Sequence, residues 1–415
     1  MDARPRVLLV APRDSYRTVP YIEAARRQGI ELLIASEGRE ALSGSDAPGL
    51  RVDLHDLPRS IESVTRAAAT RAFAGVVGTD DTSLQLAVEA SARLGLPHNP
   101  IESIRRARRK DLARARLAQA ALRVPRFRCI DLACPLESQL AALSYPLVVR
   151  PVALSASRGV IRADDLSELR RAIARVRRIV TDARDPEERD TLLIEEFIPG
   201  AEVAVEGLLS GGRLEVLAIF DKPDPLDGPY FEETYYVTPS RHPPAVLQAL
   251  TETVAAACAA YGLREGPIHA ECRINSEGVW ILEVAARTIG GLCGRLLRFG
   301  TGYGLEELVL GHVLGRRPDA RSETGGAGVL MIPIPQAGIL RRVEGIVAAQ
   351  RVPYVEGGVI DVREGYELVP LPEGSSYLGF IFARAPSAAA AEAALRAAYA
   401  ALRIVVAPLW RVERG

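Results

Sequence analysis

Lysine is nearly absent from this chain of 415 residues. Of its 52 basic residues, only Lys110 and Lys222 are lysines, and the other 50 are arginines. An excess of charge of either sign is also absent, because 52 acidic residues balance the basic ones. This balance excludes a global basic field of the kind that binds nucleic acid or anionic membranes. The two remaining lysines are therefore of interest as individual residues.

Long hydrophobic runs and paired cysteines are missing as well. No run reaches the roughly 18 apolar residues of a membrane span, and the apolar stretch near the N-terminus is too short for a signal peptide. The odd number of cysteines, without Cys-x-x-Cys spacing, predicts buried free thiols in a reducing cytoplasm. A nucleophilic role for Cys293 stays open, although no histidine placement supports it. The cysteines are Cys129, Cys134, Cys258, Cys272 and Cys293.

An alternation of strand and helix patterns fills residues 1–100. The apolar run 6–12 is typical of a buried parallel strand, and the helix pattern after it stops at Gly29. Further strands are expected at 30–36 and 73–81. Such an alternation predicts an α/β fold with a parallel sheet.

The loops that follow these strands form the expected ligand-binding side of the sheet. Residues 12–18 are one such loop, at the carboxyl end of the first strand. No G-x-G-x-x-G motif occurs, so we do not predict a dinucleotide-binding fold. A helix is expected to begin near Thr82, with Asp81 or Thr82 as its N-cap.

The middle of the chain mixes helix and strand patterns. A basic amphipathic helix carries Lys110, and the arginines of 105–109 and 170–178 are interpreted as solvated helix faces. Residues 145–165 read as strand, Ser/Gly turn and strand. The charged run 182–190 predicts an exposed loop.

A hairpin at 266–287 carries the strongest chemical signal. Glu271 and Glu283 lie at about equal distance from its turn, so they are expected to face each other across the ladder. Two ionised carboxylates that close repel unless a cation lies between them, and oxygen ligands fit Mg²⁺. Arg287 could stabilise charge that develops beside such a metal. The alternative is an ordinary surface pair with a nearby arginine.

Three other segments carry weaker signals. The turn 154–160 offers backbone N–H groups to a phosphate. The strand that ends at Glu195 and Glu196 releases main-chain groups that could bond the edge of a planar ring. The acidic, aromatic loop within 220–240 begins at Lys222 and is long for a connection, as binding loops often are. Each segment alone also fits an ordinary turn or hairpin.

In this order, the four features resemble the ATP-grasp superfamily of carboxylate–amine and carboxylate–thiol ligases. The resemblance is strongest to the L-amino acid ligases that form dipeptides and to carnosine-synthase-like proteins. Its specific pointer is the sequence EVAAR at 283–287, followed by Gly290, Gly291 and Gly294. The implied architecture is an N-terminal parallel α/β domain over 1–100, an ATP-grasp domain over 101–315 with a mobile β-lobe at about 145–200, and a C-terminal α+β, β-rich extension over 316–415.

The resemblance implies ATP and one or two Mg²⁺ or Mn²⁺ ions as cofactors. The residues that would bind ATP are Lys110, Arg150, Ser155, Ser157, Gly159, Glu195, Glu196, Ile198 and Glu202, with Glu195, Glu196 and Ile198 meeting adenine largely through main chain and Glu202 holding the ribose. Those that would hold metal are Glu271 and Glu283. Arg287 and Lys222 would be catalytic, with Lys222 reaching the γ-phosphate. The candidates for substrate contact are Glu232, Glu233, His242, His269 and Arg295.

The chain departs from the family pattern at two positions. Where the family has lysine in a VVKP pattern, this sequence reads VVRP, so Arg150 takes the position with a planar fork in place of a point charge. Where many members carry asparagine after the second glutamate, this sequence has Ala285, as in the dipeptide ligases. One metal ligand is therefore expected to be missing.

The implied activity is a two-step ligation. A carboxylate would attack the γ-phosphate of ATP to form an acyl phosphate, and an amine would then displace phosphate to form an amide. The expected partners are small-molecule carboxylate and amine substrates, neither nucleic acid nor membrane, and a second copy in a homodimer. Two alternatives stay open, namely a biotin-carboxylase-like ATP-grasp carboxylase and an ATP-binding regulatory protein without catalysis.

Overall fold

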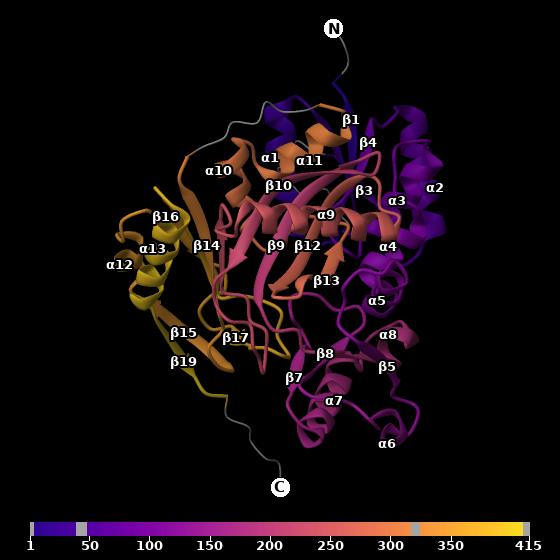
Figure 1. The fold of residues 1–415 in the computed structure, drawn as a ribbon. Coiled ribbons are helices and arrows are strands. Elements are labelled where there is room, and N and C mark those ends of the chain that lie inside the picture. Colours follow the sequence, from indigo (N-terminus) through magenta and orange to yellow (C-terminus); the bar gives the residue numbers. More distant parts are fainter. Residues whose placement is uncertain (1–3, 39–47, 317–323, 410–415) are drawn as a thin grey trace.

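The computed structural model describes residues 4–38, 48–316 and 324–409 (Figure 1). Strands of the described chain form four sheets. Every helix in these residues falls short of the length and apolar content that a membrane span requires. The predicted start of the C-terminal region near 316 adjoins residues 317–323, which lie outside the described residues.

The N-terminal sheet is parallel, as the alternating pattern predicted. Its order is β3-β2-β1-β4, and the apolar run of β1 is buried between its neighbours. The first helix stops because Gly29 adopts a left-handed conformation with φ of 66°, which glycine accepts without strain. The strands are β1 (Arg6–Val10), β2 (Glu31–Ser36), β3 (Gly49–Arg51) and β4 (Gly75–Gly78), and the helices are α1 (Thr18–Gln28), α2 (Leu57–Thr70) and α3 (Leu84–Arg93).

The predicted cap of α3 was wrong. Its helical turns begin two residues later than expected, after Ser83. The turn before it is held by Asp80, whose Oδ1 accepts hydrogen bonds from the backbone N–H groups of Thr82 and Ser83 at 2.9 and 3.2 Å. Asp81 is thereby left to make a different contact in the cavity.

The lobe that follows is a small antiparallel sheet with order β5-β8-β6-β7 (Figure 1). It begins earlier than the predicted 145, because β5 pairs with β8 at its edge. Helix α7 covers it with an apolar face that recurs every three or four residues. The elements here are α4 (Ile101–Arg108), α5 (Lys110–Gln119), β5 (Phe127–Asp131), α6 (Leu136–Gln139), β6 (Leu147–Pro151), β7 (Ile161–Ala163), α7 (Leu166–Val180), α8 (Pro186–Asp190) and β8 (Thr191–Glu196).

Three local predictions in this lobe were wrong or incomplete. The run 182–190 contains helix α8, because Asp185 caps it and Pro186 suits its first turn. Arg109 is buried, since Asp111 and Glu187 bind its guanidinium at 2.7–3.0 Å. The prediction of buried thiols fails at two cysteines that lie on and after edge strand β5, namely Cys129 and Cys134.

The central sheet is the largest and joins two predicted domains. Its order is β13-β12-β9-β10-β11-β14-β18-β16, so strands of the C-terminal extension continue the sheet of the ATP-grasp region. Helix α9 packs against the sheet on strands β10 and β13. The elements are β9 (Ala201–Ser210), β10 (Arg213–Lys222), β11 (Tyr235–Thr238), α9 (Pro244–Tyr261), β12 (Gly266–Asn275), β13 (Gly278–Ala285), the 3-10 helix η1 (Cys293–Leu296), α10 (Leu297–Thr301), α11 (Leu305–Val313), β14 (Gly326–Ile332), β16 (Val355–Ile360) and β18 (Gly379–Ala385).

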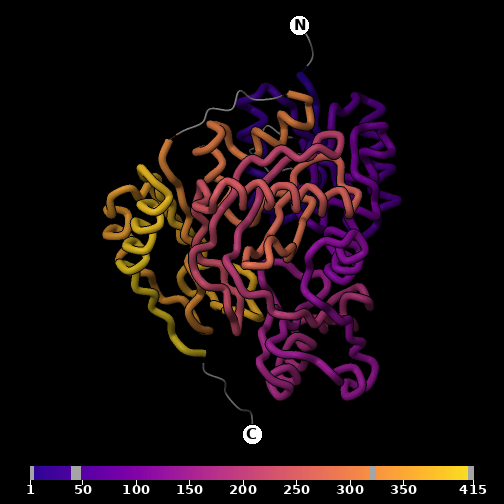
Figure 2. The backbone as a smooth tube through the Cα atoms, viewed as in Figure 1, coloured from indigo at the N-terminus to yellow at the C-terminus, as the bar shows by residue number. Residues whose placement is uncertain are grey.

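The rest of the C-terminal extension forms a three-stranded sheet with order β17-β15-β19 and two helices. Figure 2 traces this region in yellow, on the opposite side of the central sheet from the indigo N-terminal domain. The elements are β15 (Gly338–Glu344), α12 (Ile346–Gln350), β17 (Glu367–Leu368), α13 (Ala388–Ala400) and β19 (Arg403–Ala407).

Candidate active site

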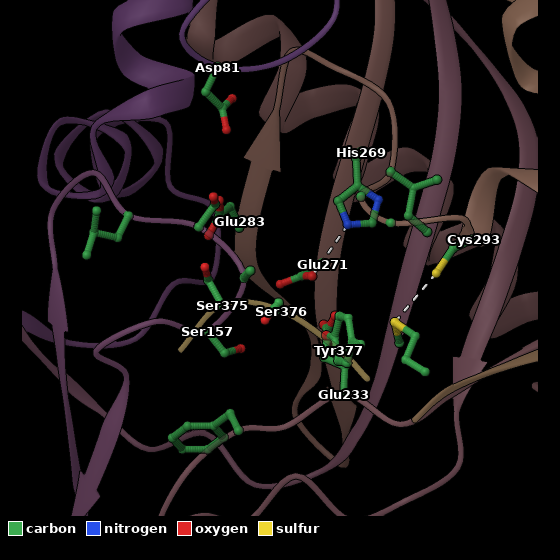
Figure 3. A pocket seen from close by; sticks show the side chains of 18 of the residues that line it. Asp81, Ser157, Glu233, His269, Glu271, Glu283, Cys293, Ser375, Ser376 and Tyr377 are labelled. Atoms are coloured by element: carbon green, nitrogen blue, oxygen red, sulfur yellow. Dashed lines mark hydrogen bonds and ion pairs between the residues drawn. The ribbon is translucent and has the colours of Figure 1, made fainter. Parts of the chain in front are cut away.

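A cavity of about 1210 Å³ lies where all of these regions meet. The loop after β1, predicted to bind ligand, contributes residues 12–17 to its wall. The turn between β6 and β7, the hairpin β12–β13 and residues 375–377 of the C-terminal extension form other parts. Figure 3 shows side chains from these separate segments facing the same space.

Most of the predicted site residues line this cavity. Five candidates in the described chain lie outside its wall, which are Lys110, Gly159, Lys222, Glu232 and His242. The predicted residues in the wall are Arg150, Ser155, Ser157, Glu195, Glu196, Ile198, Glu202, Glu233, His269, Glu271, Glu283, Arg287 and Arg295.

The predicted pairing of the two hairpin glutamates is confirmed. Glu271 and Glu283 are register partners on β12 and β13, and a β-bulge follows Glu271. Both carboxylates face the cavity (Figure 3). Each is bound to a different set of protein cations, and these two sets define the two ends of the site.

The first set, which we call the Glu283 cluster, contains Lys110, Arg114 and Arg150 with Glu195 and Glu283. Arg150 binds Glu283 at 3.0 Å and Glu195 at 3.5 Å, and Arg114 also binds Glu195. Lys110 Nζ lies 2.8 Å from the carbonyl oxygen of Leu154 and 3.4 Å from both Glu283 oxygens. Three cations thus share two carboxylates, and this end of the cavity carries surplus positive charge.

Burial and neighbouring charge shape the pKa values in the Glu283 cluster. Burial lowers the pKa of Lys110, and the positive charge of Arg150 lowers it further. Although burial opposes them, Arg114 and Arg150 hold the pKa of Glu195 below its usual value. Glu195 therefore remains ionised and fixes both guanidinium groups at the cavity wall.

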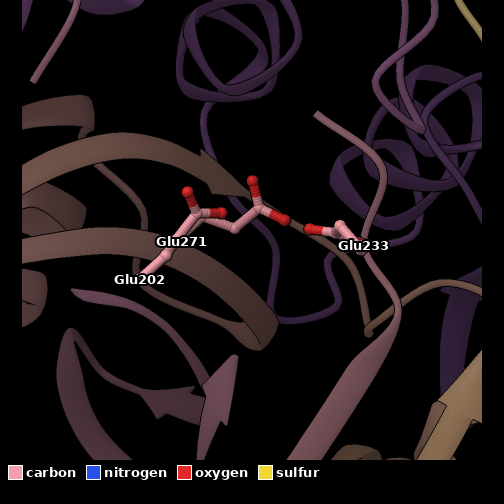
Figure 4. Close-up of side chains that lie close together, drawn as sticks. All are labelled: Glu202, Glu233 and Glu271. Atoms are coloured by element: carbon pink, nitrogen blue, oxygen red, sulfur yellow. The ribbon is translucent and has the colours of Figure 1, made fainter. Parts of the chain in front are cut away.

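The second set, the Lys222 cluster, contains Lys222 with Glu202, Glu233 and Glu271 (Figure 4). Lys222 Nζ binds all three carboxylates, with distances of 2.8 Å to Glu202 and 3.2 Å to Glu271. Its side chain is only 3% exposed. The three donors of one ammonium meet three acceptors, an arrangement that a planar guanidinium does not reproduce.

Further contacts surround the Lys222 cluster. Arg273 binds Glu202 at 3.0 Å, and His269 links Glu206 at 2.6 Å to Glu271 at 3.4 Å. With these residues included, three cations face four carboxylates. This end of the cavity therefore carries surplus negative charge.

The pKa values of the groups in this cluster reflect its excess of carboxylates. Burial and the neighbouring Glu271 raise the pKa of Glu233 to about 7. Against the effect of burial, hydrogen bonds to Glu206 and Glu271 raise the pKa of His269 to about 9. Lys222 and His269 hold the pKa of Glu271 well below its usual range despite burial. Glu233 is thus the carboxylate of this cluster that can exchange a proton near neutral pH.

The turn between β6 and β7, residues 152–160, is called the flap below. Ala156 and Ser157 adopt φ of 54°, and Gly159 adopts φ of 74°. Left-handed non-glycine residues cost conformational energy and cluster at functional loops. The flap also contacts Lys110, whose backbone N–H donates to the carbonyl of Val152 at 2.8 Å.

The adenine and ribose predictions fall on the strand end after β8. The carbonyl of Ile198 accepts a hydrogen bond from the guanidinium of Arg273 at 2.6 Å, and the backbone N–H of Glu196 donates to the carbonyl oxygen of Arg126. Both oxygens of Glu202 are engaged, by Lys222 and Arg273. A ribose hydroxyl would therefore share this carboxylate with two cations, and the role of Glu202 stays a prediction.

Asp81 is a site residue that sequence reasoning placed elsewhere. Its Oδ2 accepts a hydrogen bond from Arg287 Nε at 2.9 Å. Although burial opposes it, Arg287 lowers the pKa of Asp81. An N-terminal loop thus orients the arginine predicted to stabilise developing charge.

Other residues of the site carried no sequence signal. Arg114 looked like one more arginine on a basic helix, and Tyr236 like part of a loop, although it donates to Glu233 at 2.9 Å. Residues 375–377 come from a segment whose position near the cavity depends on the fold of the C-terminal extension.

Family models match three parts of the chain. The ATP-grasp N-terminal domain matches residues 22–98, the ATP-grasp domain matches 143–295, and the L-amino acid ligase C-terminal domain 2 matches 330–407. The chain thus contains the domains of an ATP-grasp ligase. This assignment confirms the predicted family, fold class and enzyme class.

Known amino acid ligases are similar to this chain. The crystal structure of L-amino acid ligase from Bacillus licheniformis matches it with a TM-score of 0.84 and 28% identity, over 98% of this chain and 100% of that one. Alanine–anticapsin ligase of Bacillus subtilis is 22% identical over 254 residues, which is 57% of this chain and 53% of that one. The match thus spans about half the length of that relative.

The carboxylase alternative has structural neighbours as well. Biotin carboxylase from Campylobacter jejuni matches the ligase with a TM-score of 0.65 and 15% identity, over 96% of this chain and 92% of that one. At this identity the likeness concerns the fold alone.

Proposed function

We propose that this ligase activates the carboxylate of one amino acid with ATP and joins it to the amino group of a second. The observation that carries the proposal is the charge polarity of the cavity, which is positive at the Glu283 cluster and negative at the Lys222 cluster. The first step requires a triphosphate, and the amine of the second step binds as an ammonium group, so the two ligands have opposite charges. One cavity with two oppositely charged ends can hold both.

The nucleotide belongs at the positive end. Lys110 and Arg150 would bind phosphate oxygens, and backbone N–H groups of the flap around Ser155 and Ser157 would cover them. Each cation would exchange Glu283 for phosphate, since Arg150 in the cavity wall contacts that carboxylate at 3.0 Å and Lys110, which lies outside the wall, contacts it at 3.4 Å. The main chain at Glu196 and Ile198 would meet the adenine ring.

Mg²⁺ or Mn²⁺ fits the oxygen donors of Glu271 and Glu283. These carboxylates are cross-strand partners on the cavity wall, and hard cations of this kind prefer carboxylates together with substrate phosphates. When bound, the metal would neutralise phosphate charge. Glu202, Glu233 and Glu271 also place oxygens within 4.8 Å of one another, but Lys222 already supplies the cation there.

The chemistry needs two nucleophilic attacks. A carboxylate oxygen attacks the γ-phosphorus and ADP leaves, and then a neutral amine attacks the acyl carbon and phosphate leaves. Arg287, which Asp81 holds in the cavity wall, would stabilise charge on the acyl oxygen. Glu233 would accept the proton that the ammonium must lose. Arg295, also in the wall, would contact a substrate carboxylate.

Phosphate release from ATP, measured with pairs of amino acids and followed by mass spectrometry of the products, tests this function. We expect release only with particular pairs, together with the mass of a dipeptide. Release that needs bicarbonate and no amino acid would indicate the carboxylase alternative. Tight ATP binding without release in any mixture would indicate a regulatory nucleotide-binding protein.

A further inference from the structure

A segment of the C-terminal extension binds the flap. We call residues 369–377 the strap. The backbone N–H of Gly159 donates to the carbonyl of Pro372 at 2.9 Å, and Arg158 Nε donates to the carbonyl of Glu373 at 2.9 Å. More than two hundred residues separate these partners along the chain.

An ion pair between the strap and helix α7 reinforces the contact. Arg175 on α7 binds the carboxylate of Glu373 with two hydrogen bonds, at 2.6 and 2.8 Å. Arg175 also donates to the hydroxyl of Tyr230, which lies in the long loop between β10 and β11. One guanidinium thus joins the strap, the lobe and the loop that carries Glu233.

The strap continues directly into the cavity. Ser375, Ser376 and Tyr377 line the wall together with Ser157 and Glu233 (Figure 3). Gly374 makes this possible, because a Cβ atom there would lie 1.8 Å from the carbonyl oxygen of Val369. The strap makes a tight turn at Gly374. Before the turn, Pro372 and Glu373 bind the flap, and after it, residues 375–377 line the cavity at the substrate end.

The ion pair is suited to reversible closure. The side chains of Arg175 and Glu373 are 34% and 43% exposed, and exposed pairs contribute little to global stability. Their two-bond geometry nevertheless gives a defined orientation. A contact of this kind orients the flap without being needed for the fold of the lobe, whose core is formed by α7 and its sheet.

We propose that Glu373 and Arg175 are positioning residues that form a clasp, which holds the flap closed over ATP and couples closure to the substrate end through Ser375, Ser376 and Tyr377. This inference rests on the proposed ligase function. Closure of the flap would keep water from the acyl phosphate. The clasp therefore determines whether the acyl group of the acyl phosphate is transferred to water or to the amine, with phosphate leaving in both cases.

Hydrogen exchange of the flap tests the clasp without any need for turnover. With Mg²⁺ and a non-hydrolysable ATP analogue bound, Glu373→Gln and Arg175→Gln should each speed exchange of a peptide spanning 155–160 by about fivefold or more. Arg171→Gln is the matched control, because Arg171 lies on the same helix and its pair with Glu168 is exposed. The charge-swapped double variant, Arg175→Glu with Glu373→Arg, should restore slow exchange. Wild-type exchange in both single variants would overturn the clasp.

The coupling is tested by product stoichiometry. With ATP and a mixture of the common amino acids, both single variants should release more phosphate per amide formed than the wild type does, by about fivefold. A faster-exchanging flap with an unchanged ratio would overturn the coupling to the substrate end. If the wild type formed no amide at all, the ligase function would fail, while the exchange result would still decide the clasp.

Discussion

The two ends of the cavity use the same kind of residue for opposite purposes. Each end has one of the two lysines, and each lysine offers three N–H donors. Lys110 shares Glu283 with Arg150, so its surroundings are rich in cations. Lys222 stands among three carboxylates. A chain with no net charge can therefore still separate charge strongly within one site, because the local ratio of cations to carboxylates sets the sign.

Removing the carboxylate that joins the hairpin to the positive end should have the largest effect. Glu283→Ala should lower kcat by about a thousandfold, or ~4 kcal/mol, because it removes a proposed metal ligand, takes the carboxylate partner from Lys110 and leaves Arg150 with Glu195 alone. Phosphate release measures the rate, and circular dichroism checks the fold. Glu277→Gln, in the exposed turn of the same hairpin, serves as control. Retained turnover would mean that the metal site is misplaced.

Removing the ammonium group of the Lys222 cluster should mainly reduce stability. Lys222→Met should lower the free energy of unfolding by about 3 kcal/mol, because three buried carboxylates lose their shared ammonium. Lys110→Met should cost less, since Arg150 still binds Glu283. Urea titration of both variants measures the difference. Equal losses would contradict the contrast between the two ends.

The pH dependence of amide formation should report the titration of Glu233, the proposed proton acceptor at the negative end. Glu233 acts as a base only when ionised, so amide formation should rise as pH increases through about 7. Glu233→Gln should lose about a hundredfold in rate and also lose this step. Glu232→Gln is the control that distinguishes the two neighbouring glutamates predicted from the sequence, because the side chain of Glu232 lies outside the cavity wall. A step that persists in Glu233→Gln would assign it to another group.

We expect protein stability to depend on pH because of His269, which links Glu206 and Glu271. Because the folded-state pKa of His269 is raised to about 9, its protonation stabilises the protein fully below pH 6.5 and is lost as pH rises through about 9. We expect the free energy of unfolding to fall by roughly 3 kcal/mol over this window. His269→Gln should flatten the curve. An equally steep fall in the variant would exclude this histidine as the cause.

The smallest effect is expected where the chain departs from its family. Arg150→Lys should change kcat/KM by less than about threefold, because an ammonium still offers charge to phosphate and to Glu283. Lys222→Arg should be tolerated less well, since a planar fork cannot meet three carboxylates around one point. Lys110→Arg should also impair ATP use. Steady-state kinetics with varied ATP compares the three variants.

Local patterns predicted much of the framework correctly. The parallel N-terminal sheet follows from the spacing of apolar runs, and the pairing of Glu271 with Glu283 follows from their equal distance to one turn. Both depend on short-range geometry, which repeats along the chain with a fixed period. The same reasoning failed for the α3 cap and for helix α8, where one neighbouring aspartate decided the boundary.

The sequence by itself determined that the two lysines stand apart from a uniform arginine background and that two glutamates face each other on a hairpin. Only the tertiary structure decided which charges surround each lysine and that a strap from the C-terminal extension meets the flap. The physical reason is distance along the chain. Lys222 meets Glu271 and Arg175 meets Glu373 only after separate strands and lobes pack together, and no local period records that packing.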